Sequence, residues 1–434
     1  MTKVSTKKEY SSSGVDWLGD IPSTWNLVPM RSLFRNRKQI VGAEAVKYTL
    51  LGLTLNGVKP RDLSLGGKNP RDYDSYQIFE PGELVMCLFD YDVTPRTVGY
   101  VMQRGIMTGA YTRLIPRNKL DPRYYFYLFL YFDERKELLH LCTGLRNSIS
   151  KYVFWSLLNP YPPLEIQKRI ADFLDEKTKV VDELIEKKQK LIELLHEKRG
   201  VLITHTVTKG LDSNAKLKPS GIDWLGNIPA GWEARKLKYL SHIDTSGIFG
   251  DEVVSDVEAK LVTTGQLSMS GEWYWEKMDN RFFTKDEYRK FKNIYGDIVV
   301  VKSSGSSTNI ISGKAGFVSE KEVGTVFGNF LLRIRALNII NPKFLYYFLT
   351  SHLTRQRIEL MCSSTTYPNL KVWEYVSALI LLPPMNVQKN VVGYLDTETA
   401  KMDKAVVLIE SQIEKLKEYR SSLIYHAVTG KIKV

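Results

Sequence analysis

The sequence predicts two globular domains of the α/β or α+β type, joined by two long antiparallel helices with pseudo-twofold symmetry. Three observations predict this plan: an internal duplication, a heptad pattern at the end of each copy, and short β-rich runs mixed with helical runs between them. The chain has 434 residues, which suits two or three domains at about 150 residues each.

A motif near the start of the chain occurs a second time after its middle. Residues 13–25 read SGVDWLGDIPSTW and residues 220–232 read SGIDWLGNIPAGW, with nine of 13 positions identical. Residues 161–208 and 382–429 form a second pair, which opens on Pro-Pro-x-x-x-Gln and closes on LITHTVT and LIYHAVT. The offset grows from 207 to 221 residues, so the intervening segments differ in length by 14 residues.

The duplication divides the chain into four segments. Residues 1–160 and 211–381 are predicted to be two divergent bodies, and residues 161–210 and 382–434 two similar helical tails. Two redundant folding units would explain the similar parts. Two readers of different targets on one repeated frame would also explain why the bodies have diverged.

Each tail is predicted to be one long helix that begins after a Pro-Pro pair, because proline is tolerated at a helix start. Apolar residues recur in steps of four and three, which is the heptad pattern of a coiled coil. The inward positions are Met402, Val406, Ile409, Ile413, Leu416, Arg420 and Leu423, and 221 residues earlier Val181, Ile185, Lys188, Ile192, Leu195, Arg199 and Leu202.

The two tails are expected to pair with each other in antiparallel fashion, and an ordinary oligomerisation coiled coil is the alternative. Arg199 and Arg420 take equivalent positions, so we expect each to meet a carboxylate or to extend toward solvent. Apolar residues flank the inward positions and leave surface for a partner's helices: Leu184, Leu191, Leu194, Val407 and Leu408.

The bodies carry loops in which basic, polar and aromatic residues lie close together. Lys and Arg outnumber Asp and Glu by 61 to 48, and residues 1–160 carry +7 of the net +13, which favours a polyanionic partner. Such side chains bind phosphates and base edges, although each loop is also typical of a solvated turn. The candidate DNA contacts are Lys68, Arg71, Tyr91, Arg96, Arg146, Asn147 and Lys151 in the first body, and Lys302, Ser304, Ser306, Thr308, Asn309, Lys314, Tyr367, Asn369 and Lys371 in the second.

The sequence shows neither a P-loop, nor a glycine-rich S-adenosylmethionine loop, nor a metal-ligand spacing. Asp175-Glu176-Lys177 resembles a nuclease fragment, but it falls on a predicted helix. A signal peptide and a spanning segment are not visible, and three distant cysteines favour neither a disulfide framework nor a zinc site. A cytoplasmic location is therefore expected.

Taken together, the two heads, the Pro-Pro-x-x-x-Gln motifs and the helices ending near His-x-Val-Thr resemble the specificity subunit of type I restriction–modification systems. The resemblance covers essentially the whole chain. The family's tail often opens on Pro-Pro-x-x-Glu-Gln. Here the glutamate is replaced, but Gln167 and Gln388 are kept.

The resemblance implies that residues 1–160 and 211–381 are target-recognition domains, each reading one half of a split double-stranded DNA site. The two conserved helices would set the spacing between the halves and dock two methyltransferase subunits, which two ATP-driven restriction subunits could join. S-adenosylmethionine, ATP and Mg²⁺ would then bind to partner subunits, so this chain would bind no cofactor and catalyse nothing.

Two other readings stay open at this point. One is a coiled-coil scaffold protein that binds two protein partners, and the other is a nuclease or methyltransferase in its own right. A membrane partner is not expected, since the chain offers no spanning segment.

Overall fold

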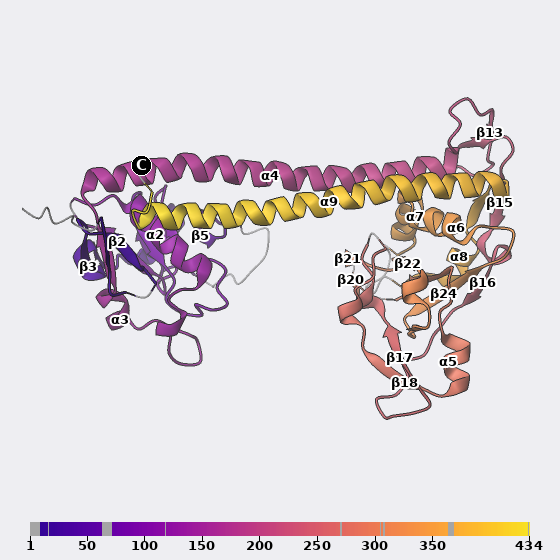
Figure 1. The fold of residues 1–434 in the computed structure, drawn as a ribbon, viewed down its shortest axis with the longest axis horizontal. Helices are drawn as coiled ribbons and strands as arrows, with labels where there is room; N and C mark the ends of the chain where they lie inside the picture. The colour runs from indigo at the N-terminus through magenta and orange to yellow at the C-terminus, as the bar shows by residue number, and fades with distance from the viewer. Residues whose placement is uncertain are drawn as a thin grey trace, which may run out of the picture. The chain divides into compact units, whose positions relative to one another are not determined.

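The computed structural model describes residues 9–15, 17–62, 72–117, 119–269, 271–303, 305–306, 309–362, 369–432 and 434. The chain forms two compact units: unit 1 comprises residues 1–189 and 410–434, and unit 2 comprises residues 190–409. The helices α4 (Leu164–Lys209) and α9 (Met385–Val428) contribute one part to each unit (Figure 1). The units therefore cross the boundaries of the predicted sequence segments.

Unit 1 is built on a four-stranded antiparallel sheet in the order β4-β11-β8-β9. The strands are β4 (Phe34–Arg35), β8 (Leu84–Met86), β9 (Val98–Tyr100) and β11 (Thr112–Pro116), and helix α2 (Pro122–Arg135) packs beside β9. The other elements are β1 (Tyr10–Ser12), β2 (Asp20–Pro22), β3 (Asn26–Pro29), α1 (Met30–Leu33), η1 (Gly42–Lys47), β5 (Leu51–Thr54), β6 (Gly57–Pro60), β7 (Gln77–Phe79), β10 (Gly105–Met107), η3 (Leu139–Leu141), α3 (Lys151–Ser156) and β12 (Leu158–Tyr161).

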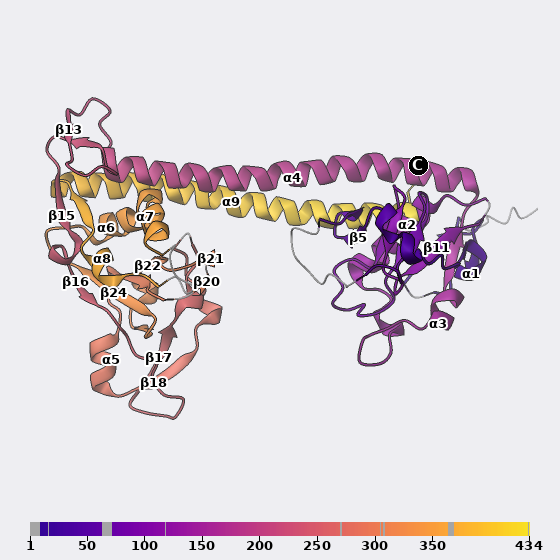
Figure 2. The same ribbon diagram turned by 180° about the vertical axis from the view of Figure 1, so that it is seen from behind.

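Unit 2 repeats this plan with the sheet order β16-β24-β19-β22, again antiparallel (Figure 2). The strands are β16 (Ser241–Asp244), β19 (Asp297–Val301), β22 (Ala315–Phe317) and β24 (Leu331–Ala336), and helix α6 (Pro342–Thr350) packs on three of them. The other elements are β13 (Leu217–Pro219), β14 (Asn227–Pro229), β15 (Glu233–Lys236), η4 (Leu237–Tyr239), β17 (Val257–Val262), η5 (Thr264–Gln266), η6 (Trp275–Lys277), β18 (Asn280–Phe283), α5 (Lys285–Phe291), β20 (Gly305–Ser306), β21 (Asn309–Ile310), η7 (Glu320–Glu322), β23 (Val326–Phe327), α7 (His352–Cys362), α8 (Val372–Val376) and β25 (Leu379–Leu382).

Antiparallel main sheets with helices packed on them make both bodies α+β, which is one of the two predicted classes. Unit 2 adds the sheet β18-β17-β23, in which β17 and β23 pair in parallel. The predicted divergence of the bodies therefore lies in what surrounds a shared four-stranded sheet.

The two body helices α2 and α6 begin by the same chemistry. The carboxylate of Asp121 accepts a hydrogen bond from the backbone N–H of Arg123 at 2.9 Å, and the amide oxygen of Asn341 accepts one from that of Lys343 at 2.9 Å. A proline follows each of these caps. Side-chain caps satisfy N–H groups that the first helical turn leaves without a partner, and proline at that position loses nothing.

Gln167 and Gln388 tie the start of each long helix to its body. Both side chains are buried. The amide of Gln167 donates to the carbonyl oxygen of Pro162 at 2.8 Å, and its oxygen accepts the backbone N–H of Asp121 at 2.9 Å. Gln388 makes the same two bonds, to the first proline of its own Pro-Pro pair and to the cap of α6. The glutamine of the repeated motif is therefore structural.

The predicted heptad positions face inward in each unit. In unit 1, Val181 of α4 and Ile413 of α9 are buried, and Lys188 donates to the side chain of Gln412 at 2.6 Å. In unit 2, the buried positions include Met402 and Ile409. A polar residue at an inward position lowers stability but fixes the register of two helices.

Arg420 and Arg199 both meet a carboxylate of the partner helix, as predicted. Arg420 bonds to Asp182 at 2.8 Å in unit 1, and Arg199 lies 3.8 Å from Asp403 in unit 2. In unit 1, residues later in α9 contact residues earlier in α4, since Gln412 meets Lys188 while Arg420 meets Asp182. The antiparallel pairing is therefore confirmed.

The end of each long helix completes the core of the unit that the other repeat begins. Ile424 and Val428 of α9 are fully buried in the core of unit 1, where the Tyr124 hydroxyl donates to the carbonyl oxygen of Val428 at 2.7 Å. Ile203 and Val207 of α4 are buried in the core of unit 2. Each core thus depends on residues that are remote in the sequence.

The tryptophan that closes each repeated head packs on the glycine that ends the helix. Gly430 and Gly210 have φ angles of +71° and +79°, which favour glycine at a helix C-terminus. A Cβ atom on Gly430 would lie 2.8 Å from the ring of Trp25, and one on Gly210 would lie 3.1 Å from that of Trp232. The head and tail motifs therefore exist for each other.

This exchange of helix ends predicts opposite effects for two equivalent substitutions. Val428→Ala removes buried methyl groups from unit 1 and should destabilise that unit by about 1–3 kcal/mol, between the losses typical of one methylene and of Leu→Ala. Hydrogen exchange measured by mass spectrometry should accelerate in α2 and stay unchanged in β19 and β24. Val207→Ala should give the reverse pattern. Equal acceleration in both units by either variant would contradict the exchange.

Candidate nucleic-acid interface

In each unit, two loops that carry predicted contact residues meet at one end of the main sheet. In unit 1, the loop after β8 meets the loop before α3, where the backbone N–H of Ile149 donates to the carbonyl oxygen of Leu88 at 2.8 Å. In unit 2, the loop after β19 meets the segment before α8 through the same bond, from Leu370 to Lys302 at 2.8 Å. The shared sheet thus brings equivalent loops together in both bodies.

Arg146 is the most firmly oriented of the exposed candidates in unit 1. Its side chain is 66% exposed, its guanidinium lies 4.9 Å from the centre of the Phe89 ring, and it bonds to both carboxylate oxygens of Asp90. These bonds lower the pKa of the Asp90 carboxyl. A planar guanidinium held on an aromatic face is suited to bidentate recognition of guanine or phosphate.

The other residues of this loop surround Arg146. Asn147 adopts a φ of 39°, and its carbonyl oxygen accepts from the backbone N–H of Tyr91 at 3.2 Å. Leu145 at the tip is fully exposed, a position that the sequence did not single out. Lys151 is exposed at the first position of α3.

Tyr91 and Arg96 are committed to the interior of unit 1. Tyr91 is buried, its hydroxyl donates to the carbonyl oxygen of Phe132 at 3.1 Å, and burial raises its pKa. The side chain of Arg96 is 13% exposed and pairs with Asp133 at 3.2 Å and Glu134 at 3.5 Å. We therefore leave both residues out of the DNA contacts proposed below.

In unit 2, the candidate side chains near the sheet end are polar. Lys302 donates to the carbonyl oxygen of Thr245 at 2.8 Å, and partial burial lowers its pKa. Asn369 accepts a hydrogen bond from the Ser303 hydroxyl. Lys371 is half-exposed and pairs with Glu374 on its own helix at 3.2 Å.

The hairpin of β20 and β21 carries Asn309, whose side chain is exposed. Arg355 of α7 donates to the carbonyl oxygens of Ser312 (2.6 Å) and Ile310, and so holds the hairpin's return strand. The sequence gave no signal for Arg355, because its partners are backbone atoms. Lys314 is partly buried, which lowers its pKa.

Six predicted contacts cannot be placed by their side chains. Lys68, Arg71, Ser304, Thr308 and Tyr367 lie outside the described residues. Ser306 belongs to β20 by its backbone, but its side chain is outside the described part of the chain. These residues remain predictions from the sequence.

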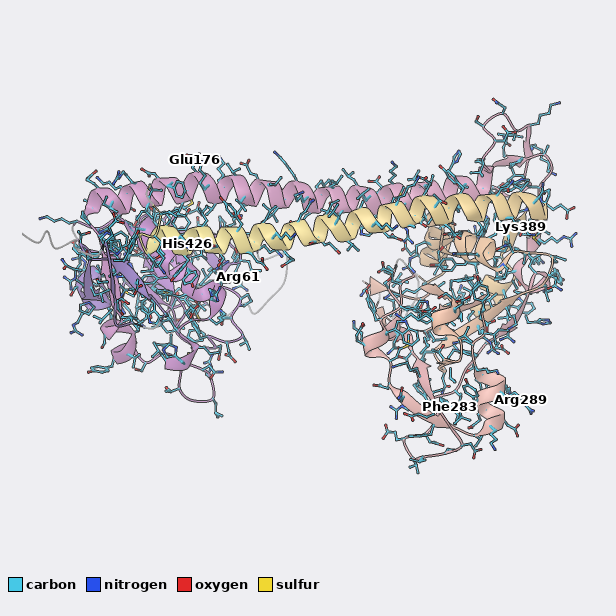
Figure 3. All side chains as sticks on the ribbon, in the orientation of Figure 1. Arg61, Glu176, Phe283, Arg289, Lys389 and His426 are labelled. Carbon is cyan, nitrogen blue, oxygen red and sulfur yellow. The ribbon has the colours of Figure 1, made fainter. Side chains whose placement is uncertain are left out.

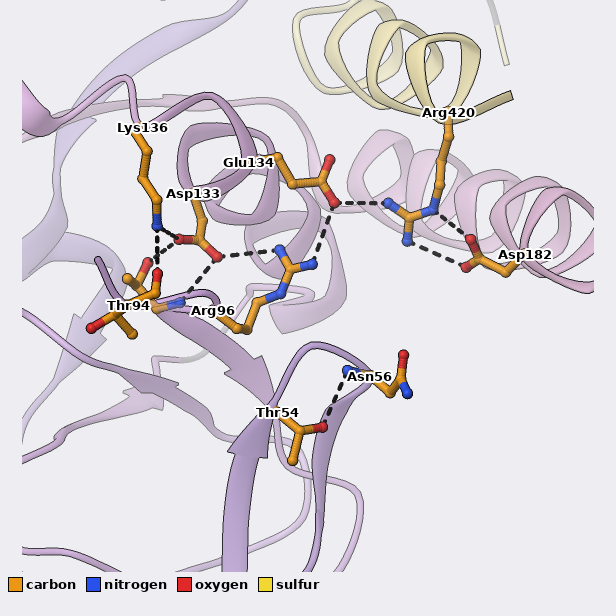
Figure 4. A network of polar contacts seen from close by, with 10 residues as sticks. Thr54, Asn56, Thr94, Arg96, Asp133, Glu134, Lys136, Asp182 and Arg420 are labelled. Carbon is orange, nitrogen blue, oxygen red and sulfur yellow. Dashed lines mark hydrogen bonds and ion pairs between the residues drawn. The ribbon is translucent and has the colours of Figure 1, made fainter. Parts of the chain in front are cut away.

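A chain of ion pairs runs from the loop after β8 to both long helices within unit 1 (Figure 4). Arg96 pairs with Asp133 and Glu134 on α2, Glu134 pairs with Arg420 of α9 at 3.0 Å, and Arg420 pairs with Asp182 of α4 at 2.8 Å. The candidate loop is therefore fixed to the helix pair by charge as well as by packing.

Asp175, part of the nuclease-like fragment, has a structural role. Its carboxylate accepts the hydroxyl of Tyr127 at 2.7 Å, and the equivalent Tyr347 donates to Asp396 at 2.6 Å in unit 2. Glu176 points outward from α4 (Figure 3) and is exposed. Over the described residues, no group of three or more His, Cys, Asp or Glu side chains could hold a metal ion. In the same part of the chain, none of the helices combines the length and apolar character needed to cross a bilayer.

Comparison with known proteins gives a consistent answer. The family model of the type I restriction modification DNA specificity domain matches residues 89–194 and 229–417. The chain is similar to the type I restriction enzyme MjaVIII specificity subunit of Methanocaldococcus jannaschii, at 25% identity over 345 residues that cover 77% of this chain and 76% of the relative. It is also similar to the EcoKI specificity subunit of Escherichia coli, at 29% identity over 136 residues, 31% of this chain and 29% of the relative.

A solved structure from work on the assembly and conformational transition of a type I R-M system has the same fold. It superposes with a TM-score of 0.70 at 13% identity, covering 95% of this chain and 99% of the other. At this identity the likeness shows the fold alone.

The buried carboxylate of Asp133 predicts how the unit 1 loop is held. It accepts bonds from the backbone N–H and hydroxyl of Thr97 and from Lys136, besides Arg96. Asp133→Ala should destabilise unit 1 by about 3–5 kcal/mol, because removing one partner leaves buried charges unpaired. Denaturant titration with hydrogen exchange of residues 88–97 measures this loss.

Asp286→Ala is the control for this substitution. Asp286 pairs with Arg289 (Figure 3) on the surface of α5, where ion pairs contribute about 0–1 kcal/mol. An Asp133 variant as stable as this control, with unchanged exchange in the loop, would show that the ion-pair chain does not hold the loop.

Proposed function

We propose, on the premise that the chain belongs to the family of type I restriction modification DNA specificity domains, that it gives such a complex its DNA sequence specificity. One observation carries the proposal: two bodies share a sheet order, and each brings an equivalent loop pair together with different residues in it. A common frame with divergent loops suits two readers of different sequences. The scaffold alternative is not favoured, because the family match includes most of both bodies.

Each body reads one half of a split double-stranded site in this proposal. The contacts proposed in unit 1 are Arg146, Asn147 and Lys151, and those in unit 2 are Lys302, Asn309, Lys314, Asn369 and Lys371. Arginine and asparagine suit bidentate contacts to guanine and adenine, and the lysines suit phosphates. Together with Lys68, Arg71, Ser304, Ser306, Thr308 and Tyr367, predicted from the sequence, they would form two reading surfaces.

The long helices set the spacing of the two half-sites. α4 and α9 are continuous helices of 46 and 44 residues, and at about 1.5 Å per residue each spans about 65–70 Å. Two weak readers on one frame bind cooperatively through effective concentration, provided that the half-sites have the matching separation.

Catalysis belongs to partner subunits in this proposal. Two methyltransferase subunits dock on the helices, whose flanks expose the apolar side chains of Leu184, Leu191, Leu194, Val407 and Leu408. They hold S-adenosylmethionine and flip the adenine that they methylate. Two restriction subunits supply the ATP- and Mg²⁺-dependent cleavage, and the whole complex works in the cytoplasm.

Point variants in the two bodies test the assignment of one body to one half-site. Arg146→Ala should weaken binding of the complex assembled with its methyltransferase subunits about 10- to 100-fold and relax one base pair in one half-site. Asn369→Ala should relax the other half-site. Methylome sequencing identifies the half-site that each variant changes, and titration of target duplex measures affinity.

Arg289→Ala serves as the control, since Arg289 is exposed on α5 away from the loop pair. A uniform loss of affinity with a lower salt slope would reassign Arg146 to a phosphate contact. If both variants altered the same half-site, or if sequence-specific binding were absent altogether, the proposal would be wrong.

The spacing role predicts the effect of lengthening both helices together. Inserting one heptad after Leu191 in α4 and one after Ile409 in α9 keeps the inward pattern and adds about 10 Å. The half-sites found by methylome sequencing should then move apart by about three base pairs. A heptad in α4 alone breaks the register and should abolish methylation. Unchanged spacing in the doubly lengthened chain would rule the role out.

A further inference from the structure

An exposed aromatic pair lies at the sheet end of unit 2, beside the proposed polar contacts. The side chains of Phe249 and Phe330 are 43% and 50% exposed, and their ring centroids are 6.0 Å apart at an interplanar angle of 75°. Single exposed apolar residues are common on protein surfaces. Two that pack on each other from separate segments form a small apolar surface.

The backbone around this pair is held in place. The N–H groups of Lys302 and Ser303 donate to the carbonyl oxygen of Phe330 at 2.8 and 3.3 Å. A Cβ atom on Gly247 would lie 1.8 Å from the carbonyl oxygen of Phe327, so glycine is what lets the segment before Phe249 approach this turn. The pair is therefore a fixed surface.

Unit 1 places a small residue where unit 2 places Phe330. Leu114 of β11 pairs with Leu84, and Ile334 of β24 pairs with Ile298, so counting back along the two strands sets Ala110 opposite Phe330. Ala110 is exposed. Because the shared sheet does not require an aromatic side chain at this position, Phe330 belongs to the part of unit 2 that differs between the bodies.

We infer that Phe249 and Phe330 form an apolar platform that contacts the C5-methyl group of a thymine in the half-site read by unit 2. This methyl group is the apolar mark of an A·T pair in the major groove. Each ring covers part of the other, so the pair offers a low surface for a methyl group, unlike the projecting side chains that wedge between base steps. The inference rests on the proposed function and names one base that unit 2 reads.

The platform continues the polar surface of unit 2. Phe330 is bonded through its backbone to Lys302 and Ser303, and the Ser303 hydroxyl donates to Asn369. Lysine and asparagine supply hydrogen bonds to phosphates and adenine edges, and the aromatic pair supplies the apolar contact that these side chains lack. An A·T pair read by both kinds of contact fits this arrangement.

Thymine analogues test the inference directly. The chain, assembled with its methyltransferase subunits, is titrated with duplexes in which each thymine of the target is replaced in turn by 2′-deoxyuridine, which lacks the methyl group. One replacement in the unit 2 half-site should lower affinity about fourfold, the effect of one methyl group at about 0.8 kcal/mol. Phe330→Ala should lose a similar factor on the natural target and lose nothing further on the uracil duplex.

Two further variants keep the test independent of folding. Phe330→Leu retains an apolar side chain and should keep the sensitivity to uracil, while Phe249→Ala should reduce it. Tyr295→Ala removes an aromatic side chain that is 63% exposed at the opposite end of β19, and it should behave as the unaltered chain. Uracil in the unit 1 half-site should have the same effect in every variant.

Three results overturn the inference while leaving the proposed function intact. They are a unit 2 half-site without an A·T pair, a target whose thymines are all replaceable at no cost, and a Phe330→Ala chain that retains full sensitivity to uracil. A complex that shows no preference for any sequence would overturn the proposed function, and the inference with it.

Discussion

The burial of two helix ends is the interaction on which the rest of this structure depends. Val428 and Val207 fill equivalent places in two cores, and the tryptophans of the repeated heads close over the glycines that follow. A long amphipathic helix is marginal by itself and gains stability from what it packs against. Here each helix starts at one body through a buried glutamine and ends inside the core of the other unit.

This constraint reaches the loops as well. The ion-pair chain from Arg96 to Asp182 joins the loop after β8 to α4 and α9 inside unit 1. Arg146 is in turn held by Asp90 and the Phe89 ring, so the exposed guanidinium starts from one orientation. A side chain that is already oriented loses less conformational entropy on binding, which favours discrimination between similar partners.

The frame was predictable from the sequence because it is written twice. Heptad spacing located Arg199 and Arg420 at inward positions, and a helix with apolar neighbours on both sides leaves such an arginine little choice but a carboxylate. Asp175 was correctly kept out of a catalytic site because it fell on that helix. Two copies of one pattern with the same offset constrain each other, and this is what local composition alone lacks.

The reading surface was less predictable, because burial in loops depends on remote residues. Tyr91 and Arg146 come from equally polar loops, yet the first bonds inside the core to Phe132 and the second stands exposed on Phe89. Phe249 and Phe330 are unremarkable singly and meet only through the fold. The excess positive charge of the first body was an uncertain guide too, since Arg96 and Arg113 are spent on buried carboxylates.

The division of the chain into residues 1–189 with 410–434, and 190–409, has a consequence for how the protein is made. A ribosome releases the first body early, but its core lacks Ile424 and Val428 until the last residues emerge. Unit 2, by contrast, has all of its residues once position 409 has left the ribosome. The half of the protein that is synthesised first is therefore finished last, and its apolar core must wait through most of translation.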